Sequence, residues 1–109
     1  MAKLIQRGDE LDYTPTADVA AGAVVVQEDL VGVACREIKA GQLGALSVTG
    51  VYEFPKQTGG GKDIPAGRKV YWDETPGIVK KGSGGATYLG KAVLTAGEDD
   101  ETVRVRLEQ

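Results

Sequence analysis

The segment DVAAGAVVV, residues 18–26, places an Ala-Gly pair shortly before a run of three valines. Glycine adopts positive φ without a steric clash at Cβ, so an Ala-Gly pair is a favourable place for the chain to reverse. Valine is enriched in strands because its branched side chain packs well on a pleated surface. The segment therefore predicts a tight turn that leads into a β-strand.

The same Ala-Gly turn recurs along the chain. An acidic residue and a branched aliphatic residue precede it in the segments that end at Gly22, Gly41 and Gly67, while the segment ending at Gly97 keeps only the turn. We expect all four glycines to be structural turns. Because the repeats are imperfect, they predict the corners of one compact β body rather than a solenoid of equal units.

Other segments show strand periodicity. Residues 46–54 alternate apolar and polar side chains, and Gly50 interrupts the alternation, as a bulge or a close backbone approach would. Residues 102–107 alternate in the same way. The segments 30–34 and 88–94 share a Gly-x-Ala centre, which indicates a duplicated supersecondary unit.

These patterns predict the fold class. No window of the sequence has an apolar face at helical spacing, and sixteen glycines favour short strands joined by tight turns. We predict an all-β protein, a small single-domain β-barrel or β-sandwich over residues 1–109, with glycine-rich loops at 55–62 and 80–85. Residues 1–7 are a candidate N-terminal arm.

Charge and composition limit the classes of partner. The net charge of −3 argues against a nucleic acid or an anionic membrane bound over the whole surface, although a local basic patch would be compatible with it. The longest apolar run, residues 19–26, is too short to span a bilayer. The first residues lack the apolar stretch of a signal peptide, which predicts residence in a reducing cytoplasm.

Catalytic and cofactor-binding patterns are missing from the sequence. There is no histidine, the commonest general base and metal ligand. The single cysteine, Cys35, follows an apolar strand-like run, so we expect a buried thiol. The glycine-rich segment 58–63 fails the phosphate-loop pattern, because Lys56 stands where a glycine is needed and Asp63 where Ser or Thr is needed. The acidic run 98–101 lacks the spacing of a calcium loop. We predict no catalytic residue, cofactor or metal.

In the order of its strand and turn motifs, the chain resembles the small capsid cement, or head decoration, proteins of tailed phages and prophages. Members of this family have carried an uncharacterised-domain label and sometimes a recombinase-like one, which the failed phosphate-loop test does not support. The resemblance covers almost the whole chain. It is carried by residues 8–14 (GDELDYT), 17–22 (ADVAAG), 24–26 (VVV), 30–34 (LVGVA), 50–56 (GVYEFPK), 64–67 (IPAG), 70–73 (VYWD), 89–92 (LGKA) and 103–107 (VRVRL).

The resemblance implies a non-enzymatic structural protein on the exterior of the virion. Such a protein binds the major capsid protein and stabilises the contacts between neighbouring subunits, after synthesis in the host cytoplasm. It implies a homo-oligomer, dimer or trimer, with no nucleic-acid or membrane partner. One alternative is a head-surface module that binds host carbohydrate or anchors a fibre. Another is an enzyme with paired carboxylates, Asp9 or Asp12 near Asp73.

The residues that would contact a partner are apolar, aromatic or basic. An apolar pair near the N-terminus would add a strand to the capsid surface or complete this protein's own sheet. An aromatic residue on the outer face of a strand would anchor a partner, or Trp72 would be core while Tyr71 packs under a loop. Two arginines would make charged contacts or keep the wet face of an edge strand soluble. The candidates are Leu4, Ile5, Tyr71, Trp72, Arg104 and Arg106.

Overall fold

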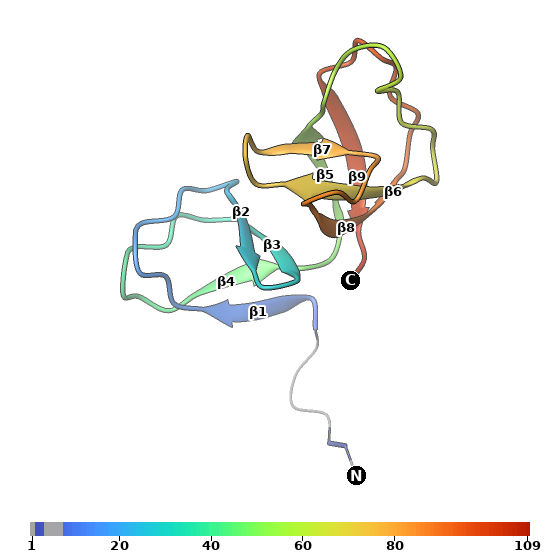
Figure 1. Ribbon diagram of the computed structural model, residues 1–109. Coiled ribbons are helices and arrows are strands. Elements are labelled where there is room, and N and C mark those ends of the chain that lie inside the picture. Colours follow the sequence, from blue (N-terminus) through green and yellow to red (C-terminus); the bar gives the residue numbers. More distant parts are fainter. Residues whose placement is uncertain (1, 4–7) are drawn as a thin grey trace. The chain divides into compact units, whose positions relative to one another are not determined.

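The computed structural model describes residues 2–3 and 8–109, and within them it has nine β-strands and no helix (Figure 1). The all-β prediction is confirmed. No helix that could cross a membrane occurs in this part of the chain. Leu4 and Ile5 of the candidate arm lie outside the described residues. The strands are β1 (Glu10–Tyr13), β2 (Val24–Gln27), β3 (Leu30–Ala34), β4 (Gly44–Ser47), β5 (Val51–Pro55), β6 (Lys69–Asp73), β7 (Ile78–Lys80), β8 (Thr87–Ala92) and β9 (Thr102–Leu107).

The strands form two sheets, and the pairs β1–β4, β3–β4, β5–β9, β6–β7, β6–β8 and β8–β9 are antiparallel. One sheet has the order β1-β4-β3-β2 and the other the order β5-β9-β8-β6-β7. The chain divides into two compact units, the first made of residues up to Val25 and Gly32–Thr49, the second of Val26–Val31 and Gly50–Gln109. Whether they act as one domain stays a prediction.

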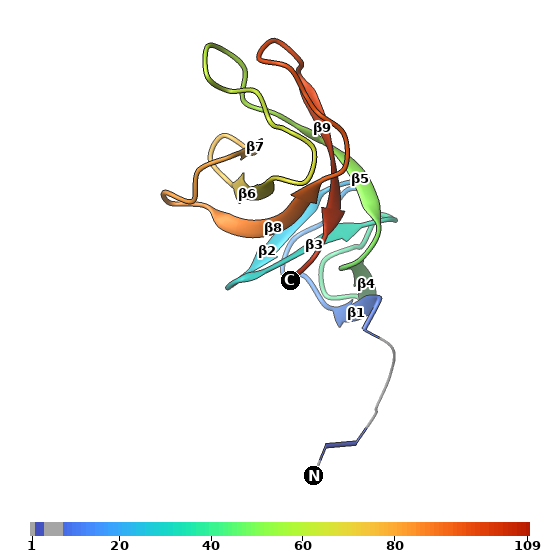
Figure 2. The ribbon, with the colours of Figure 1, turned by 90° about the vertical axis from the view of Figure 1, so that its right-hand side faces the viewer.

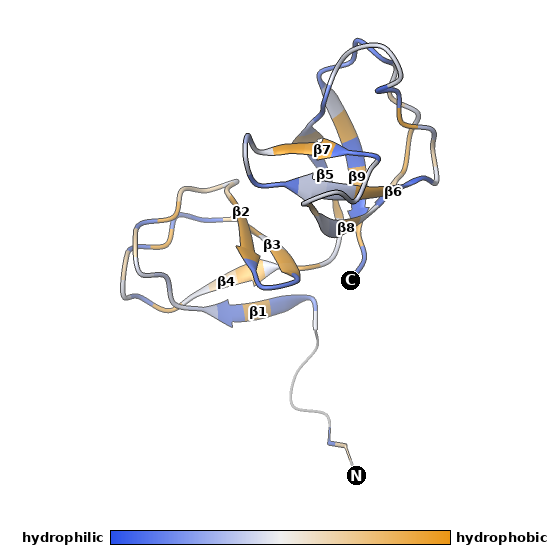
Figure 3. Ribbon diagram, in the orientation of Figure 1, coloured by the Kyte–Doolittle hydropathy of each residue, from blue (hydrophilic) through white to orange (hydrophobic). Residues whose placement is uncertain are grey.

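The first unit has a small apolar core. Ala34, Ile38 and Leu46 are buried together, and partly buried Tyr13 and Val19 pack against them. Strands β2 and β3 are mainly hydrophobic, whereas β1 is mainly hydrophilic (Figure 3). A polar edge strand of this kind discourages unwanted pairing with other chains.

The second unit has a larger core built from alternate residues of its strands. In β9, the apolar residues of the predicted alternation are buried and the two arginines are exposed. Beyond the end of β5, Lys56 forms a parallel bridge with Val79 of β7, and the Gln57 N–H donates to the Val79 carbonyl at 3.1 Å. The sheet is curled, as Figure 2 shows, and the bridge joins its two edges at one place. The choice between barrel and sandwich stays a prediction.

The single strand expected over residues 46–54 is wrong. The segment contains the end of β4 and most of β5, which belong to different sheets. Gly50 separates them with a φ of 109°, a conformation that ends the extended run, and its carbonyl accepts the Leu107 N–H at 2.9 Å. The interruption in the alternation therefore marks a change of sheet.

The two sheets repeat one plan, which agrees with the duplication indicated by the Gly-x-Ala centres. The orders β1-β4-β3-β2 and β5-β9-β8-β6 correspond strand by strand, and β7 is an addition. In the first unit, Val19 and Ile38 exchange two backbone hydrogen bonds of 2.8 Å. In the second, Ile64 and Ala96 do the same at 2.8 and 2.9 Å.

Further backbone hydrogen bonds match between the units. The Gly22 N–H donates to the Ala34 carbonyl at 2.6 Å, and the Gly67 N–H donates to the Ala92 carbonyl at 2.7 Å. The return bonds, from Ala34 to the Ala23 carbonyl and from Ala92 to the Arg68 carbonyl, are both 3.0 Å. The Ala-Gly turn therefore holds the same place in each unit, against the end of β3 or β8.

The glycine of each Gly-x-Ala centre permits a close approach between strands. A Cβ atom at Gly32 would lie 2.8 Å from the Leu46 Cβ in β4. A Cβ atom at Gly90 would collide with the Arg106 carbonyl in β9. The shared motif thus has a packing reason, because only glycine lets these strands lie so near each other.

The four Ala-Gly turns differ in backbone conformation. Gly22, Gly41 and Gly67 have φ values of 85°, 78° and 86°, in the left-handed region where glycine is favoured. Gly97 has a φ outside this region. Its turn is held instead by Asp100, whose carboxylate accepts the Gly97 N–H at 2.7 Å and whose own N–H donates to the Gly97 carbonyl at 3.2 Å.

Candidate functional site

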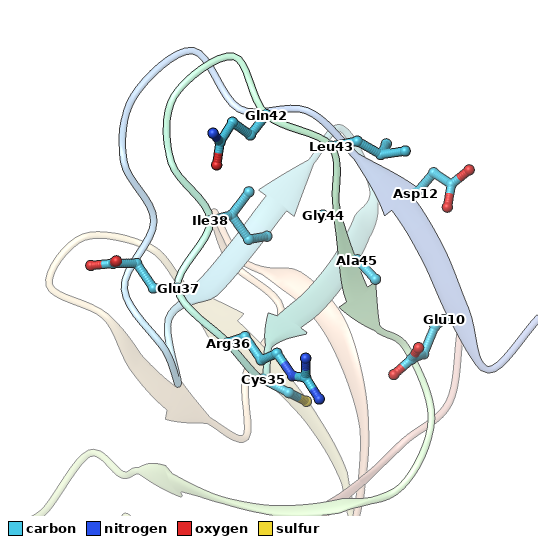
Figure 4. A pocket seen from close by; sticks show the side chains of 10 residues that line it. All are labelled: Glu10, Asp12, Cys35, Arg36, Glu37, Ile38, Gln42, Leu43, Gly44 and Ala45. Carbon is cyan, nitrogen blue, oxygen red and sulfur yellow. The ribbon is translucent and has the colours of Figure 1, made fainter.

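Each unit has a surface pocket between its edge strand and the loop that leads into the neighbouring strand. The first pocket has a volume of about 510 Å³ and is formed by β1, the segment after β3 and the start of β4 (Figure 4). Its lining residues are Glu10, Asp12, Cys35, Arg36, Glu37, Ile38, Gln42, Leu43, Gly44 and Ala45.

The second pocket is smaller, with a volume of about 230 Å³. It is formed by β5, the segment after β8 and the start of β9. Its lining residues are Glu53, Leu94, Thr95, Ala96, Asp100, Glu101, Thr102, Val103 and Arg104.

The Asp18 side chain helps to fix the loop of the first pocket. The Asp18 carboxylate accepts the Ala40 N–H at 2.9 Å, and the Lys39 ammonium lies 3.7 Å from Asp18 and 3.3 Å from Glu37. These ion pairs are more than half exposed, so the backbone hydrogen bond is the stronger constraint. Beneath them, Gly44 makes room for Ile38, because a Cβ atom there would lie 2.7 Å from the Ile38 Cδ1.

The expectation of a buried Cys35 is wrong. Strand β3 ends at Ala34, and the next residue, Cys35, is exposed and lines the first pocket. The apolar run before it predicted burial, but the strand ends one residue too early for the thiol to face the core.

The two predicted aromatic anchors point to opposite faces of β6. Trp72 is only 7% exposed and packs on Phe54 with 5.9 Å between ring centroids, while its indole Nε1 has no hydrogen-bond partner among the described residues. Tyr71 is half-buried and contacts Tyr88 edge-on, with 5.7 Å between the two ring centroids. The structure therefore favours the alternative in which Trp72 is a core residue.

The two predicted arginines are exposed, but their strand is not an edge strand. Strand β9 lies between β5 and β8, so the expectation of an edge position is wrong. Arg104 stands opposite Glu53, and Arg106 stands opposite Val51, which is 55% exposed. Among the predicted contact residues that the structure describes, Arg104 is the one that lines one of the two pockets.

The carboxylates named for an enzymatic alternative belong to different units. Asp9 and Asp12 are in the first unit, and Asp73 is in the second, where the Lys80 ammonium lies 3.1 Å from its carboxylate. The hydrogen bond from Lys80 lowers the pKa of Asp73 below its ordinary value of 3.8, and the Thr75 N–H, which donates at 3.2 Å, lowers this pKa further. This environment keeps Asp73 ionised as the partner of Lys80.

We expect Asp73→Asn to lower the melting temperature at neutral pH. A carboxyl whose pKa is lowered by folding contributes stability above its unfolded pKa, and this contribution disappears as the pH falls through the folded pKa. The difference between wild type and variant should therefore close below about pH 4. Thermal unfolding between about pH 7 and pH 2 measures it, with Asp29→Asn in the exposed β2–β3 turn as the control. A difference independent of pH would contradict the assignment.

The residues that sequence reasoning missed are the exposed leucines and the acidic side chains of the pockets. Leu43 is 71% exposed and Leu94 is 54% exposed, although leucine is ordinarily a core residue. Their exposure has no local signal in the sequence. The repeated Gly-x-Ala motif was the sequence feature that indicated a relation between the surroundings of the two pockets.

The comparisons with known proteins gave one match. A family model described as phage cement protein matches residues 5–107 of the chain. No curated protein and no solved structure matches the chain. Within the described residues, no group of three or more His, Cys, Asp or Glu side chains is placed to hold a metal ion.

Proposed function

The chain belongs to the phage cement protein family, and we propose that it binds the exterior of an assembled phage head and stabilises the contacts between neighbouring major capsid subunits. The family match over residues 5–107 is the observation that carries this proposal, because it spans both units of the fold. A cement protein is a structural component of the virion, and this role needs no catalytic group.

The described surface supports a binding role. Leu43, Val51 and Leu94 each leave more than half of their surface exposed, and apolar side chains of this kind supply binding energy when a partner covers them. Many copies of the protein on one shell would also tie the same lattice of subunits. The high effective concentration of linked binding sites then makes the protein bind the head much more strongly than one modest contact would.

We further propose that the protein acts as a homo-oligomer, dimer or trimer, on the outside of the capsid. It would be made in the cytoplasm of the bacterial host and join the head during assembly. The two pockets described above give no support to binding of host carbohydrate, since neither of them is lined by an aromatic side chain.

Co-sedimentation tests the proposal. The purified protein is mixed with undecorated, expanded heads of its own phage, and the heads are pelleted. We expect binding that saturates at a fixed copy number per head, and heads that better resist heat. Matched heads incubated with an unrelated β protein serve as the control. A protein that stays in the supernatant at every concentration would rule out cementing.

A further inference from the structure

The two pockets occupy the same place in the repeated plan of the two units. Ile38 in the first pocket and Ala96 in the second are the bridge partners of Val19 and Ile64, the matching residues before each Ala-Gly turn. Each pocket is then closed by the outer strand of its sheet, β1 or β5.

The loops that follow also correspond. The Gln42 N–H donates to the Lys39 carbonyl at 3.0 Å, and the Asp100 N–H donates to the Gly97 carbonyl at 3.2 Å. Gln42 and Asp100 both line their pocket just before β4 or β9 begins. The same loop in the same place therefore builds each pocket.

The two pockets carry the same set of side chains. Each is lined by three carboxylates, one guanidinium and one exposed leucine, and each has a formal charge of −2. The charged residues and the leucine stand at different positions in the two pockets, yet the set is the same. The charged residues are Glu10, Asp12, Glu37 and Arg36 in the first pocket, and Glu53, Asp100, Glu101 and Arg104 in the second.

The two pockets together account for a formal charge of −4 (−2 and −2), whereas the whole chain has a net charge of −3. The acidic excess of the chain is therefore concentrated at the two pockets. Charge complementarity then favours a basic partner segment, and the exposed leucine beside the carboxylates favours an apolar side chain within that segment. Such a segment can lie along the edge strand that closes each pocket.

We propose that the two pockets are equivalent docking sites, each of which binds the same basic segment, with an apolar anchor, of one major capsid subunit. One chain would then hold two subunits. The inference rests on the proposed function and goes beyond it, because it states how a single copy cements two neighbours. It makes the chain bivalent by virtue of its internal duplication.

Charge reversal at the corresponding edge-strand positions tests bivalence. Asp12 pairs with Ala45 in β4, Glu53 pairs with Arg104 in β9, and both carboxylates are exposed. We expect Asp12→Lys and Glu53→Lys each to weaken binding to expanded heads at least about tenfold, since each loses one of two linked contacts. The double variant should bind no better than background. Asp29→Lys, with the same change of charge at an exposed site outside the pockets, should bind like wild type.

The saturating copy number separates bivalence from one extended interface. A bivalent chain occupies two capsid sites, whereas a chain with one pocket disabled occupies one. At saturation, each single variant should therefore load up to about twice as many copies per head as wild type. Thermal unfolding of each variant establishes that it is folded before its binding is measured.

Thiol labelling gives a second readout without a change of charge. Cys35 is exposed in the first pocket, and Thr102 is exposed in the lining of the second. Wild type reports on the first pocket, and the double variant Cys35→Ser, Thr102→Cys reports on the second. We expect alkylation by a maleimide to slow at least about tenfold in both proteins when they are bound to heads.

Three other outcomes would each refute either the paired docking sites or the proposed function. If wild type binds heads while one pocket's variant and thiol are unaffected, the paired sites are refuted and cementing stands. If the variants change self-association in analytical ultracentrifugation and leave head binding intact, the pockets join copies of this chain and the proposal fails. If wild type does not bind heads, the proposed function fails first.

Discussion

Replacing Gly90 with alanine is expected to lower the free energy of unfolding by about 3 kcal/mol or more. The added Cβ would collide with the Arg106 carbonyl oxygen and lie 3.1 Å from the Glu108 backbone nitrogen. Backbone atoms within a paired sheet cannot turn aside as a flexible side chain can, so β8 and β9 would have to separate. Urea denaturation followed by tryptophan fluorescence measures the loss, since Trp72 is buried in the same unit.

Two other alanine variants show whether the collision is the cause. Gly84→Ala adds a Cβ in open space, where no atom lies within 4 Å, and should change stability by less than about 0.5 kcal/mol. Gly32→Ala, at the corresponding position of the first unit, meets the Leu46 side chain and should cost about 1–3 kcal/mol. Equal losses for Gly90→Ala and Gly84→Ala would refute the explanation.

Replacing Lys56 with methionine is expected to lower the free energy of unfolding by about 3 kcal/mol. Lys56 is only 4% exposed, and its ammonium donates to three backbone carbonyls, those of Gln57 at 2.7 Å, Asp100 at 3.1 Å and Glu98 at 3.5 Å. Methionine keeps most of the buried stem and removes the donors, so these carbonyls lose a charged partner. Chemical denaturation at neutral pH measures the loss.

The exposed Lys62 provides the matched control. Lys62→Met makes the same chemical change on the surface and should leave stability within about 0.5 kcal/mol of wild type. Because the ammonium of Lys56 holds the loop that contains Asp100, Lys56→Met should also weaken the second pocket more than the first. Hydrogen exchange would then rise in residues 98–101 and stay unchanged in 36–43. Uniform exchange along the chain would contradict this role.

Lys56 also shows where sequence reasoning stopped. The sequence predicts a flexible surface loop over residues 55–62, since glycine, proline and polar residues dominate it. In the structure, Pro55 belongs to β5 and Lys56 is buried. A lysine is buried at little cost only when all of its donors have acceptors, and the acceptors at Glu98 and Asp100 are far away in the sequence.

The candidate site was predictable only in part. The sequence placed Arg104 on an exposed strand face, and the Gly-x-Ala centres indicated the duplication that relates the two pockets. It did not predict that Leu43 and Leu94 are exposed, or that Glu53 of β5 pairs with Arg104 of the neighbouring strand β9. Exposure depends on which segments cover a side chain, and these segments are distant along the chain.

The sequence by itself determined the all-β class, the family, the alternation of β9 and the left-handed turns at Gly22, Gly41 and Gly67. Each class of secondary structure follows from side-chain period and from φ preference, which are properties of a few adjacent residues. Only the tertiary structure decided the change of sheet at Gly50, the central place of β9, the burial of Trp72 and the two matching pockets. These features depend on which strands pair and which faces are covered, and contacts between distant segments decide both.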